Sequence, residues 1–284
     1  MQHTFRLIID CPDQIGLVAS VSQFLADHQA TIVEASHHTD QQTGRFFMRH
    51  EIGTDKLALD HQQFIAAFTP LAEQYKMQWK LTDSARKQRV ALLGSLESHC
   101  LVDLLHRWHT QELYCDIPCI ISNHPQLKQF ADWYKVPFHW VDFKGQSKAQ
   151  AFAQITTLLE EYQIDLTVLA RFMQILPDTL CQQLLGRAIN IHHSFLPSFA
   201  GARPYQQAYD RGVKLIGATC HYVTRDLDEG PIIEQAVKRI SHSDTAQDMV
   251  RKGKDCEVTV LAHGVRYHLE DRVIIHRNKT VVFA

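Results

Sequence analysis

The chain has 284 residues, of which 45% are hydrophobic and 21% charged, the profile of an ordinary globular protein of about two domains. Its 29 lysines and arginines against 31 aspartates and glutamates give a net charge of -2, so no cationic field attracts nucleic acid or an anionic membrane. Seven cysteines without a paired framework favour the cytoplasm. The start resembles no signal peptide, and no apolar run approaches the roughly 18 to 20 residues of a membrane helix.

The first 83 residues predict a small ferredoxin-like domain of order βαββαβ. A strand over 4–11 is followed by a helix with apolar residues at helical spacing from Leu17. A hairpin follows, then a second helix from about Leu59, and a short strand over 77–81 ends the unit. The polar stretch after it lacks apolar periodicity. We therefore expect domains over residues 1–83 and 90–284, with a linker over 84–89.

The second domain is predicted to be α/β, with a mostly parallel, mixed sheet. Strands alternate with helices of about ten to fifteen residues, an arrangement that implies a parallel sheet covered on both faces. The expected strands lie over 90–93, 117–122, 138–141, 166–170 and 188–192, and the expected helices over 98–109, 126–134, 148–162 and 178–185. Two later strands, over 216–224 and 232–240, are close enough to pair as an antiparallel hairpin. A helix from about residue 245 and a terminal hairpin around 277–279 complete the chain.

The polar residues with the best chance of carrying chemistry follow the parallel strands. Asn190 and His192 are two apart on a strand, so they point to the same face, at the end of the sheet where such folds bind ligands. The loop 224–231 can bring Asp226 or Asp228 to the same edge. An amide, an imidazole and a carboxylate suffice for chemistry at a carbonyl. Spacing alone leaves open that the Asn-x-His pair is hydrogen-bonded structure.

Four motifs of this domain resemble the folate-dependent formyltransferase family. They are A-R-F-M-Q-I-L at 170–176, I-N-I-H-H-S-F-L-P at 189–197, G-A-T-C-H-Y-V at 217–223 and L-D-E-G-P-I-I at 227–233. The resemblance implies a Rossmann-like formyltransferase fold and a catalytic set of Asn190, His192 and Asp228. Spacing alone allows either Asp226 or Asp228 as the carboxylate, and it is the family motif that favours Asp228.

The N-terminal domain resembles an ACT regulatory domain in C-P-D-Q-I-G-L at 11–17 and G-R-F-F-M-R at 44–49. ACT followed by formyltransferase is the layout of the formyltetrahydrofolate deformylase family, which the segment 193–205 also resembles. The resemblance implies a hydrolase acting on a linear amide, which converts 10-formyltetrahydrofolate to formate and tetrahydrofolate. Such a reaction balances one-carbon pools and supplies formate for purine synthesis. Folate is the substrate, and no cofactor or metal is expected.

The same resemblance places the pterin of the substrate against two segments of the second domain. The expected folate contacts are Phe172, Met173, Gln174, Leu176, Thr224 and Arg225. Gln174 departs from the family pattern, in which many relatives carry Arg, so a side-chain contact there is in doubt. Asp228 is expected to activate a water or to hold His192 protonated, while Asn190 and His192 stabilise the oxyanion.

Glu97 favours water as the acceptor of the formyl group. The relative that formylates glycinamide ribonucleotide has a Gly/Ser/Asn-rich phosphate loop after its first strand, and Glu97 in the corresponding loop here would repel a phosphate. Two other hypotheses remain: transfer to an amine acceptor, or an amino-acid-binding regulator with a silent second domain. The presence of Asn190, His192 and Asp228 argues against a silent domain.

The ACT resemblance also implies partners. ACT domains commonly pair side by side and bind small effectors, so we expect a homo-oligomer and an amino-acid effector of the glycine or methionine class. Asp13, Gln14 and Gly16 are the expected effector residues. Neither nucleic acid nor membrane is an expected partner.

Overall fold

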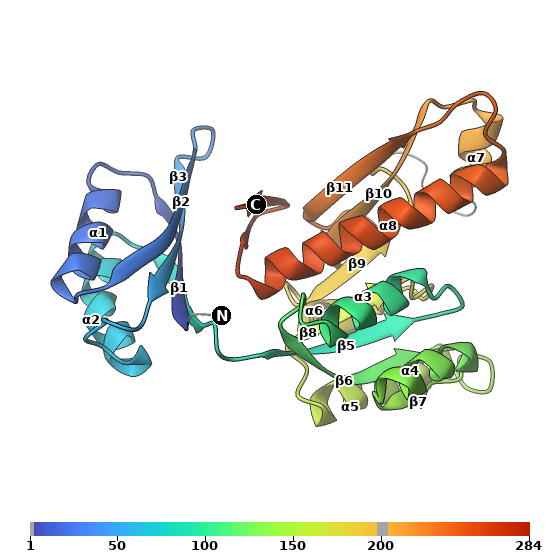
Figure 1. Cartoon of the computed structure of the whole chain (residues 1–284), viewed down its shortest axis with the longest axis horizontal. Helices are drawn as coiled ribbons and strands as arrows, with labels where there is room; N and C mark the ends of the chain where they lie inside the picture. Colours follow the sequence, from blue (N-terminus) through green and yellow to red (C-terminus); the bar gives the residue numbers. More distant parts are fainter. Residues whose placement is uncertain (1–2, 198–203) are drawn as a thin grey trace. The chain divides into compact units, whose positions relative to one another are not determined.

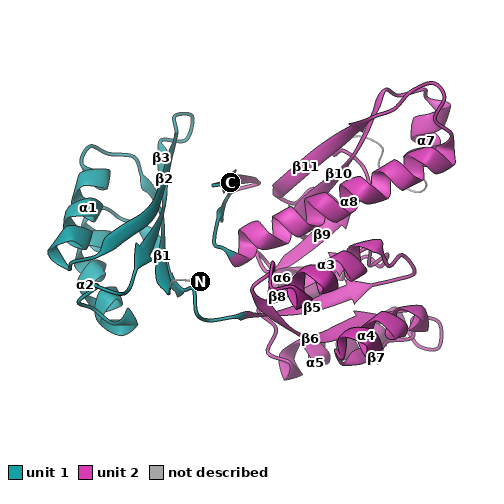
Figure 2. Cartoon of the chain, viewed as in Figure 1, with its two compact units in different colours: residues 1–87, 270–276, 281–284 teal, residues 88–269, 277–280 magenta. Residues whose placement is uncertain are grey.

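The computed structural model describes residues 3–197 and 204–284 (Figure 1). The chain divides into two compact units (Figure 2). Unit 1 comprises residues 1–87, 270–276 and 281–284, and unit 2 comprises residues 88–269 and 277–280. Over the described residues, every helix is too short or too polar to cross a membrane.

Unit 1 is a four-stranded antiparallel sheet with two helices, the βαββαβ order predicted from the sequence. The elements are β1 (Thr4–Pro12), α1 (Leu17–Asp27), β2 (Thr31–Asp40), β3 (Arg45–Gly53), α2 (His61–Gln74) and β4 (Gln78–Asp83), with strand order β2-β3-β1-β4. Both helices cover one face of the sheet (Figure 1). Phe64 and Phe68 of α2 pack there against Leu7 and Ile9 of β1, and all four are fully buried.

The end of the chain packs against unit 1, which differs from the expected boundaries. Strands β12 (Val273–His276) and β13 (Lys279–Val282) form the predicted terminal hairpin, but most of its residues group with unit 1 instead of with the second domain. Ile274 and Phe283 are buried against Ile8 and Phe47. Short apolar strands do not indicate their partners, because local sequence encodes the strand and not the surface it covers.

Unit 2 contains a seven-stranded sheet of order β11-β10-β9-β8-β5-β6-β7, so the predicted α/β class with a mostly parallel, mixed sheet is confirmed. Its strands are β5 (Gln88–Gly94), β6 (Cys115–Ser122), β7 (Phe138–Trp140), β8 (Leu166–Ala170), β9 (Ala188–His192), β10 (Leu215–Tyr222) and β11 (Ile232–Arg239). Strands β5 to β9 are parallel, and β10 and β11 add the expected antiparallel hairpin. Strand β5 begins at Gln88, so residues 88–89 belong to the sheet and not to a linker.

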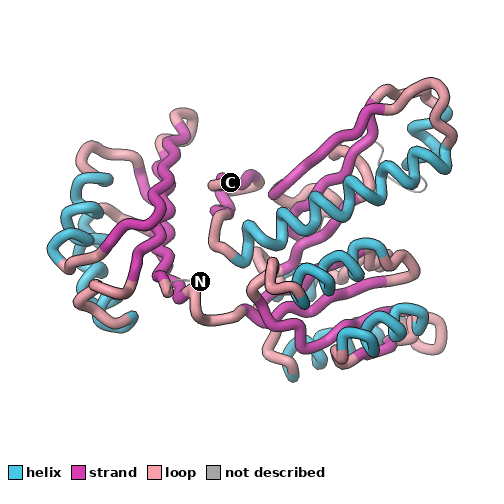
Figure 3. Tube along the Cα trace, viewed as in Figure 1, coloured by secondary structure: helices cyan, strands magenta, loops and turns pink. Residues whose placement is uncertain are grey.

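Helices alternate with the parallel strands along unit 2 (Figure 3). They are α3 (His99–His109), η1 (Pro125–Leu127), α4 (Lys128–Tyr134), α5 (Lys148–Glu161), α6 (Asp178–Gln183), α7 (Pro204–Asp210) and α8 (Ala246–Leu269). Helix α7 was not predicted, and the helix expected over 126–134 begins as a 3-10 turn. Ser147 and Gln150 start α5 with a reciprocal capping box.

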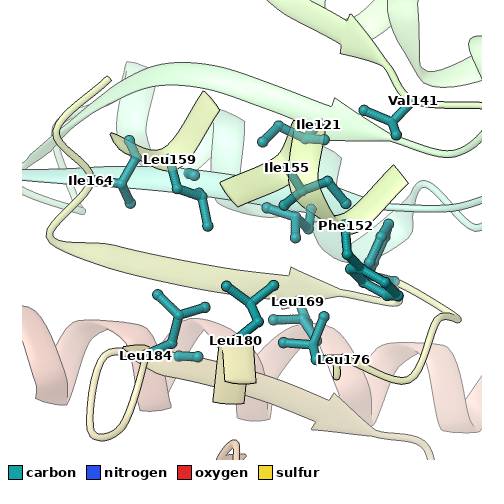
Figure 4. Close-up of a cluster of buried hydrophobic side chains, with 14 of the residues drawn as sticks. Ile121, Val141, Phe152, Ile155, Leu159, Ile164, Leu169, Leu176, Leu180 and Leu184 are labelled. Carbon is teal, nitrogen blue, oxygen red and sulfur yellow. The ribbon is translucent and has the colours of Figure 1, made fainter. Parts of the chain in front are cut away.

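One hydrophobic core of unit 2 lies between the sheet and helices α5 and α6 (Figure 4). Ile155 of α5 and Leu180 of α6 pack there against Ile121 and Leu169 of the sheet. Burial of such side chains contributes about 1.5 to 3 kcal/mol each. Because the chain passes from β5 toward β7 and then returns to β8 and β9, the point at which the strand order reverses lies between β5 and β8.

Candidate active site

A pocket of about 370 Å³ opens beyond the carboxyl ends of β8 and β9. Its walls come mainly from residues 171–176, 190–193 and 223–228. These segments follow β8, end β9 and connect β10 to β11. The pocket therefore lies at the edge of the sheet where doubly wound folds bind their ligands.

Strand β9 presents Asn190 and His192 to this pocket, as the two-residue spacing predicts. His192 is 6% exposed. The antiparallel neighbour β10 places His221 opposite Asn190 and Thr219 opposite His192. Asn190 and His192 thus project from a regular, hydrogen-bonded strand, which holds their side chains more firmly than a loop would.

Asp228 approaches His192 from the loop after β10. The Oδ1 atom of Asp228 lies 3.2 Å from Nδ1 of His192. Asp228 has a φ of 59°, an uncommon backbone conformation that Asp tolerates better than most residues. Burial raises the pKa of Asp228, but the hydrogen bond and the charge contributed by His192 outweigh burial, so the pKa lies below its usual value. Asp228 is therefore ionised at neutral pH.

A third histidine, His221, orients Asn190. The Nδ1 atom of His221 lies 3.0 Å from the carbonyl oxygen of Tyr222, to which it donates, so its Nε2 is an acceptor. That Nε2 lies 3.2 Å from Nδ2 of Asn190. Burial lowers the pKa of His221, which keeps the ring neutral. The amide of Asn190 is thereby fixed with its second N–H available.

The Nε2 atom of His192 is buried and has no hydrogen-bond partner among the described residues. An unpaired buried polar atom is costly, so such an atom at a pocket wall is typical of a site that a ligand completes. Its neighbour His193 also lines the pocket. Burial, and then the charge of Arg171, lower the pKa of His193 to about 4. The pocket thus holds the neutral imidazole of His193 together with the ionised carboxylate of Asp228.

All six residues expected to contact folate line this pocket: Phe172, Met173, Gln174, Leu176, Thr224 and Arg225. Their side chains differ in exposure. Phe172 and Leu176 are largely buried in the core, whereas Met173 is 56% exposed. Ile175 and Leu227, which lie within the two segments expected to contact the pterin, are also exposed apolar residues of the same walls. Met173, Ile175 and Leu227 form an apolar rim that suits a flat aromatic ligand.

Behind Arg171 and His193 lies a buried ionic network centred on Glu257 of α8. Glu257 is fully buried, and its oxygens lie 2.7 Å from Nε2 of His99 and 2.6 Å from the hydroxyl of Tyr205. Arg171 Nε lies 3.5 Å away. Burial raises the pKa of Glu257, but these partners outweigh it, so the pKa lies below its usual value.

Comparison with known proteins identifies the family. Residues 88–265 match the formyl transferase family model, and residues 5–60 match the ACT domain model. A formyltetrahydrofolate deformylase from Synechocystis sp. is 48% identical, over 99% of both chains. A crystal structure of a formyltetrahydrofolate deformylase from Pseudomonas syringae pv. tomato is 58% identical, with a TM-score of 0.97 over 100% of this chain and 95% of that one. The chain belongs to the formyltetrahydrofolate deformylase family.

A more distant likeness covers the second domain alone. A phosphoribosylglycinamide formyltransferase from Anaplasma phagocytophilum is 33% identical, with a TM-score of 0.65 over 70% of this chain and 96% of that one. The fold that this deformylase family member uses is therefore shared with enzymes whose names specify a transfer reaction. The resemblance stated from the sequence, ACT followed by formyltransferase, is confirmed.

The expected effector residues belong to unit 1 and are not among the residues that line this pocket. Asp13, Gln14 and Gly16 form the turn between β1 and α1. Gly16 has a φ of 93°, which favours glycine, and Gln14 Nε2 lies 3.4 Å from the carbonyl oxygen of Tyr75. The turn thus has a defined shape, and its role as an effector site stays a prediction.

One group among the described residues could meet the spacing of a metal site: His99, Cys100 and Glu257. Its chemistry favours hydrogen bonding instead. Burial raises the pKa of the Cys100 thiol well above its usual value, so the thiol resists becoming a ligand thiolate. Both oxygens of Glu257 already accept hydrogen bonds.

The sequence analysis missed His221, His193 and the Glu257 network. His221 lies in a quoted family motif, but its role depends on the register between β9 and β10. A signal for Glu257 does exist: it occupies the buried stripe of α8 that also holds Met249, Cys256 and Val260. An acidic residue on an apolar helical stripe is rarely left unpaired.

Proposed function

We propose that this enzyme hydrolyses 10-formyltetrahydrofolate to formate and tetrahydrofolate, with Asn190, His192 and Asp228 as its catalytic residues. The membership of the deformylase family supports the reaction. The observation that carries the assignment of residues is the contact of 3.2 Å between His192 and Asp228, beside an Asn190 amide that His221 orients. The three side chains meet in one pocket of the sheet edge.

The roles follow from the protonation states. Asp228 is ionised, accepts the Nδ1 proton of His192, and orients the attacking water. As the water oxygen bonds to the formyl carbon, negative charge develops on the formyl oxygen. The free N–H of Asn190 and the buried Nε2 of His192, when protonated, donate to this oxyanion. The bond from carbon to N10 then breaks, the proton lost by the attacking water passes through the site to N10, and formate and tetrahydrofolate leave.

Asp228 is preferred to Asp226 as the carboxylate. The side chain of Asp228 is only 23% exposed and contacts His192, whereas Asp226 is exposed to solvent. A carboxylate in water interacts weakly with a substrate, because solvent screens its charge. The two residues therefore form a natural pair of target and control for mutation.

The pterin is proposed to lie against residues 172–176 and 224–228. The apolar rim of Met173, Ile175 and Leu227 offers its surface to a flat ring. The backbone N–H of Met173 is already held by Ser95 Oγ at 3.0 Å, which fixes this segment on the end of β5. If the pterin binds through main-chain groups of this segment, its binding does not require the Arg that many relatives carry at the position of Gln174.

We further propose a cytoplasmic enzyme that needs no metal or cofactor, since water and folate are its only reactants. All seven cysteines are buried thiols, which fits a reducing compartment. The ACT domain supports regulation by a small amino acid of the glycine or methionine class at Asp13, Gln14 and Gly16, and a homo-oligomer built through these domains. The reaction would adjust one-carbon pools and supply formate for purine synthesis.

The test is incubation of the purified protein with 10-formyltetrahydrofolate in a buffer free of amines, following formate and tetrahydrofolate. Wild type should release both in equal amounts. Asp228→Asn should lose about a hundred to a thousand-fold in kcat, the scale for loss of one transition-state partner, and Asp226→Asn should remain active. Release of no formate by wild type would contradict the proposed reaction, and equal activity of both variants would contradict the assignment.

A further inference from the structure

Hydrolysis of the formyl group requires a carrier that takes a proton from the attacking water to N10. The water loses this proton as its oxygen bonds to the formyl carbon, and N10 gains one as its bond to that carbon breaks. The carrier must therefore have a free basic atom at the pocket, and this atom must be deprotonated at the working pH. The titratable side chains that line the pocket differ in these two properties.

Most of these side chains are already engaged. Asp228 and His192 contact each other at 3.2 Å, and they are assigned to the water and the oxyanion. Both ring nitrogens of His221 have protein partners, at 3.0 and 3.2 Å. Burial raises the pKa of the Cys181 thiol, and Asp226 is exposed to solvent. The arginines of the pocket stay protonated and accept no proton.

His193 is free to act as a base. Its imidazole lines the pocket and has no hydrogen bond or ion pair with another described residue. The sealed nitrogens without a partner in the described part of the chain include Nε2 of His192 but neither nitrogen of His193, so water reaches the His193 ring. Burial, and then the charge of Arg171, lower the pKa of His193 to about 4. The ring is therefore neutral at pH 7 and has a lone pair to offer.

His193 also lies beside the proposed catalytic pair. Its ring centre is 5.3 Å from that of His192, and the charge of Asp228 acts on it. Asn190 and His192 line the same pocket and are proposed to hold the formyl group. In the tetrahedral intermediate the water oxygen and N10 are bonded to one carbon, so a single imidazole next to that carbon can serve both atoms.

Strand β10 holds the chain directly after His193. Thr219 Oγ1 donates to the carbonyl oxygen of Ser194 at 2.9 Å and accepts from the backbone N–H of Leu196 at 3.0 Å. Thr219 is also the residue of β10 that lies opposite His192. The backbone on either side of His193 is thus fixed relative to His192, which suits a group that must transfer protons over a short distance.

We propose that His193 carries the proton from the attacking water to N10. This inference rests on the proposed function and adds His193 to the three residues assigned there. As the water oxygen bonds to the formyl carbon, its O–H bond breaks and the proton passes to the lone pair of the His193 ring. The bond from carbon to N10 then breaks, and the imidazolium gives its proton to N10 and becomes neutral again. The formic acid that leaves loses its remaining proton to solvent, giving formate.

The first experiment compares formate release by His193→Asn and by wild type. Asparagine keeps a polar side chain that forms hydrogen bonds, but its amide takes up no proton at neutral pH. Loss of acid-base catalysis costs about a hundred to ten thousand-fold in rate, so kcat should fall at least about a hundredfold while KM stays nearly unchanged. His242→Asn, at an exposed position after β11, is the matched control and should keep the kcat of wild type.

The second experiment supplies the lost base from solution. His193→Ala removes the ring, and added imidazole should raise its kcat at least about tenfold, in proportion to the imidazole concentration. This rescue should grow as pH rises through the pKa of free imidazole, because only the neutral form accepts a proton. Wild type and His242→Ala should not respond to imidazole. Thermal unfolding checks the fold of each variant, and if His193→Ala does not fold, the kcat of folded His193→Asn decides.

The role of His193 is overturned if folded His193→Asn keeps the kcat of wild type, because a proton carrier cannot be replaced by an amide. It is also overturned if imidazole leaves the kcat of folded His193→Ala unchanged, since a residue needed only for packing would behave in this way. Failure of the proposed function looks different, because wild type itself would then release no formate.

Discussion

The role of His221 can be tested through its effect on Asn190. Substitution of His221 by Phe retains a ring of similar size but removes the acceptor that lies 3.2 Å from Nδ2 of Asn190. The amide can then rotate, and its free N–H no longer stays aimed at the formyl oxygen. His221→Phe should therefore lower kcat and leave KM nearly unchanged, because the amide acts in the transition state.

Two limits bound the size of this effect. Loss of a single oxyanion donor costs about a hundred to a thousand-fold in rate, which is the ceiling for misplacing Asn190. The orienting hydrogen bond itself contributes about 0.5 to 1.5 kcal/mol. If the activation free energy rises by that amount, the reaction slows about two- to twelve-fold, which is the lower limit. We expect a decrease of about ten- to a hundred-fold, smaller than that of Asn190→Ala.

A double-mutant cycle separates an orienting role from a direct one. Rates of formate release are measured for Asn190→Ala, His221→Phe and the double variant, with thermal unfolding as a control for the fold. If His221 acts through Asn190, then His221→Phe should have little further effect once Asn190 is Ala. Additive losses would refute this reasoning and would assign His221 its own contact with the substrate.

Three further predictions concern binding, metals and pH. Ile175→Ser should raise KM for 10-formyltetrahydrofolate several-fold with kcat retained in steady-state assays, because a rim residue that is 68% exposed gives up apolar contact with the pterin. Dialysis against EDTA should leave formate release unchanged; a loss that Zn²⁺ restores would contradict the proposal that the enzyme needs no metal. The pKa of Glu257 is lowered on folding, so its contribution to stability is present above its usual value of 4.5 and lost as pH falls through the folded value. The melting temperatures of wild type and Glu257→Gln should accordingly converge in acid, and a constant difference across pH would argue against a charged Glu257.

The sequence predicted those parts of the site that follow from local periodicity. Asn190 and His192 are two apart on a strand whose apolar neighbours are buried, so their common direction follows from the pleat alone. The position of the site follows as well, because parallel strands share a carboxyl edge. The continuous apolar run of β8 likewise predicted both ends of that strand correctly, at residues 166 and 170.

Features that depend on contacts between distant segments were not predictable in the same way. His221 reaches Asn190 only through the antiparallel register of β10 on β9, and a shift of one residue would turn it to the other face. The sequence pattern predicted the terminal hairpin. It did not predict that the hairpin packs on Ile8 and Phe47, which precede it by more than two hundred residues. Local sequence constrains conformation and says little about such partners.

The chemistry at the formyl carbon is the same whether water or an amine attacks, since both reactions pass through an oxyanion and break the bond to N10. The proposed catalytic set of Asn190, His192 and Asp228 therefore does not distinguish the two outcomes. Space and charge beside the pocket do, because a nucleophile that cannot approach the carbon cannot react, however well the oxyanion is stabilised.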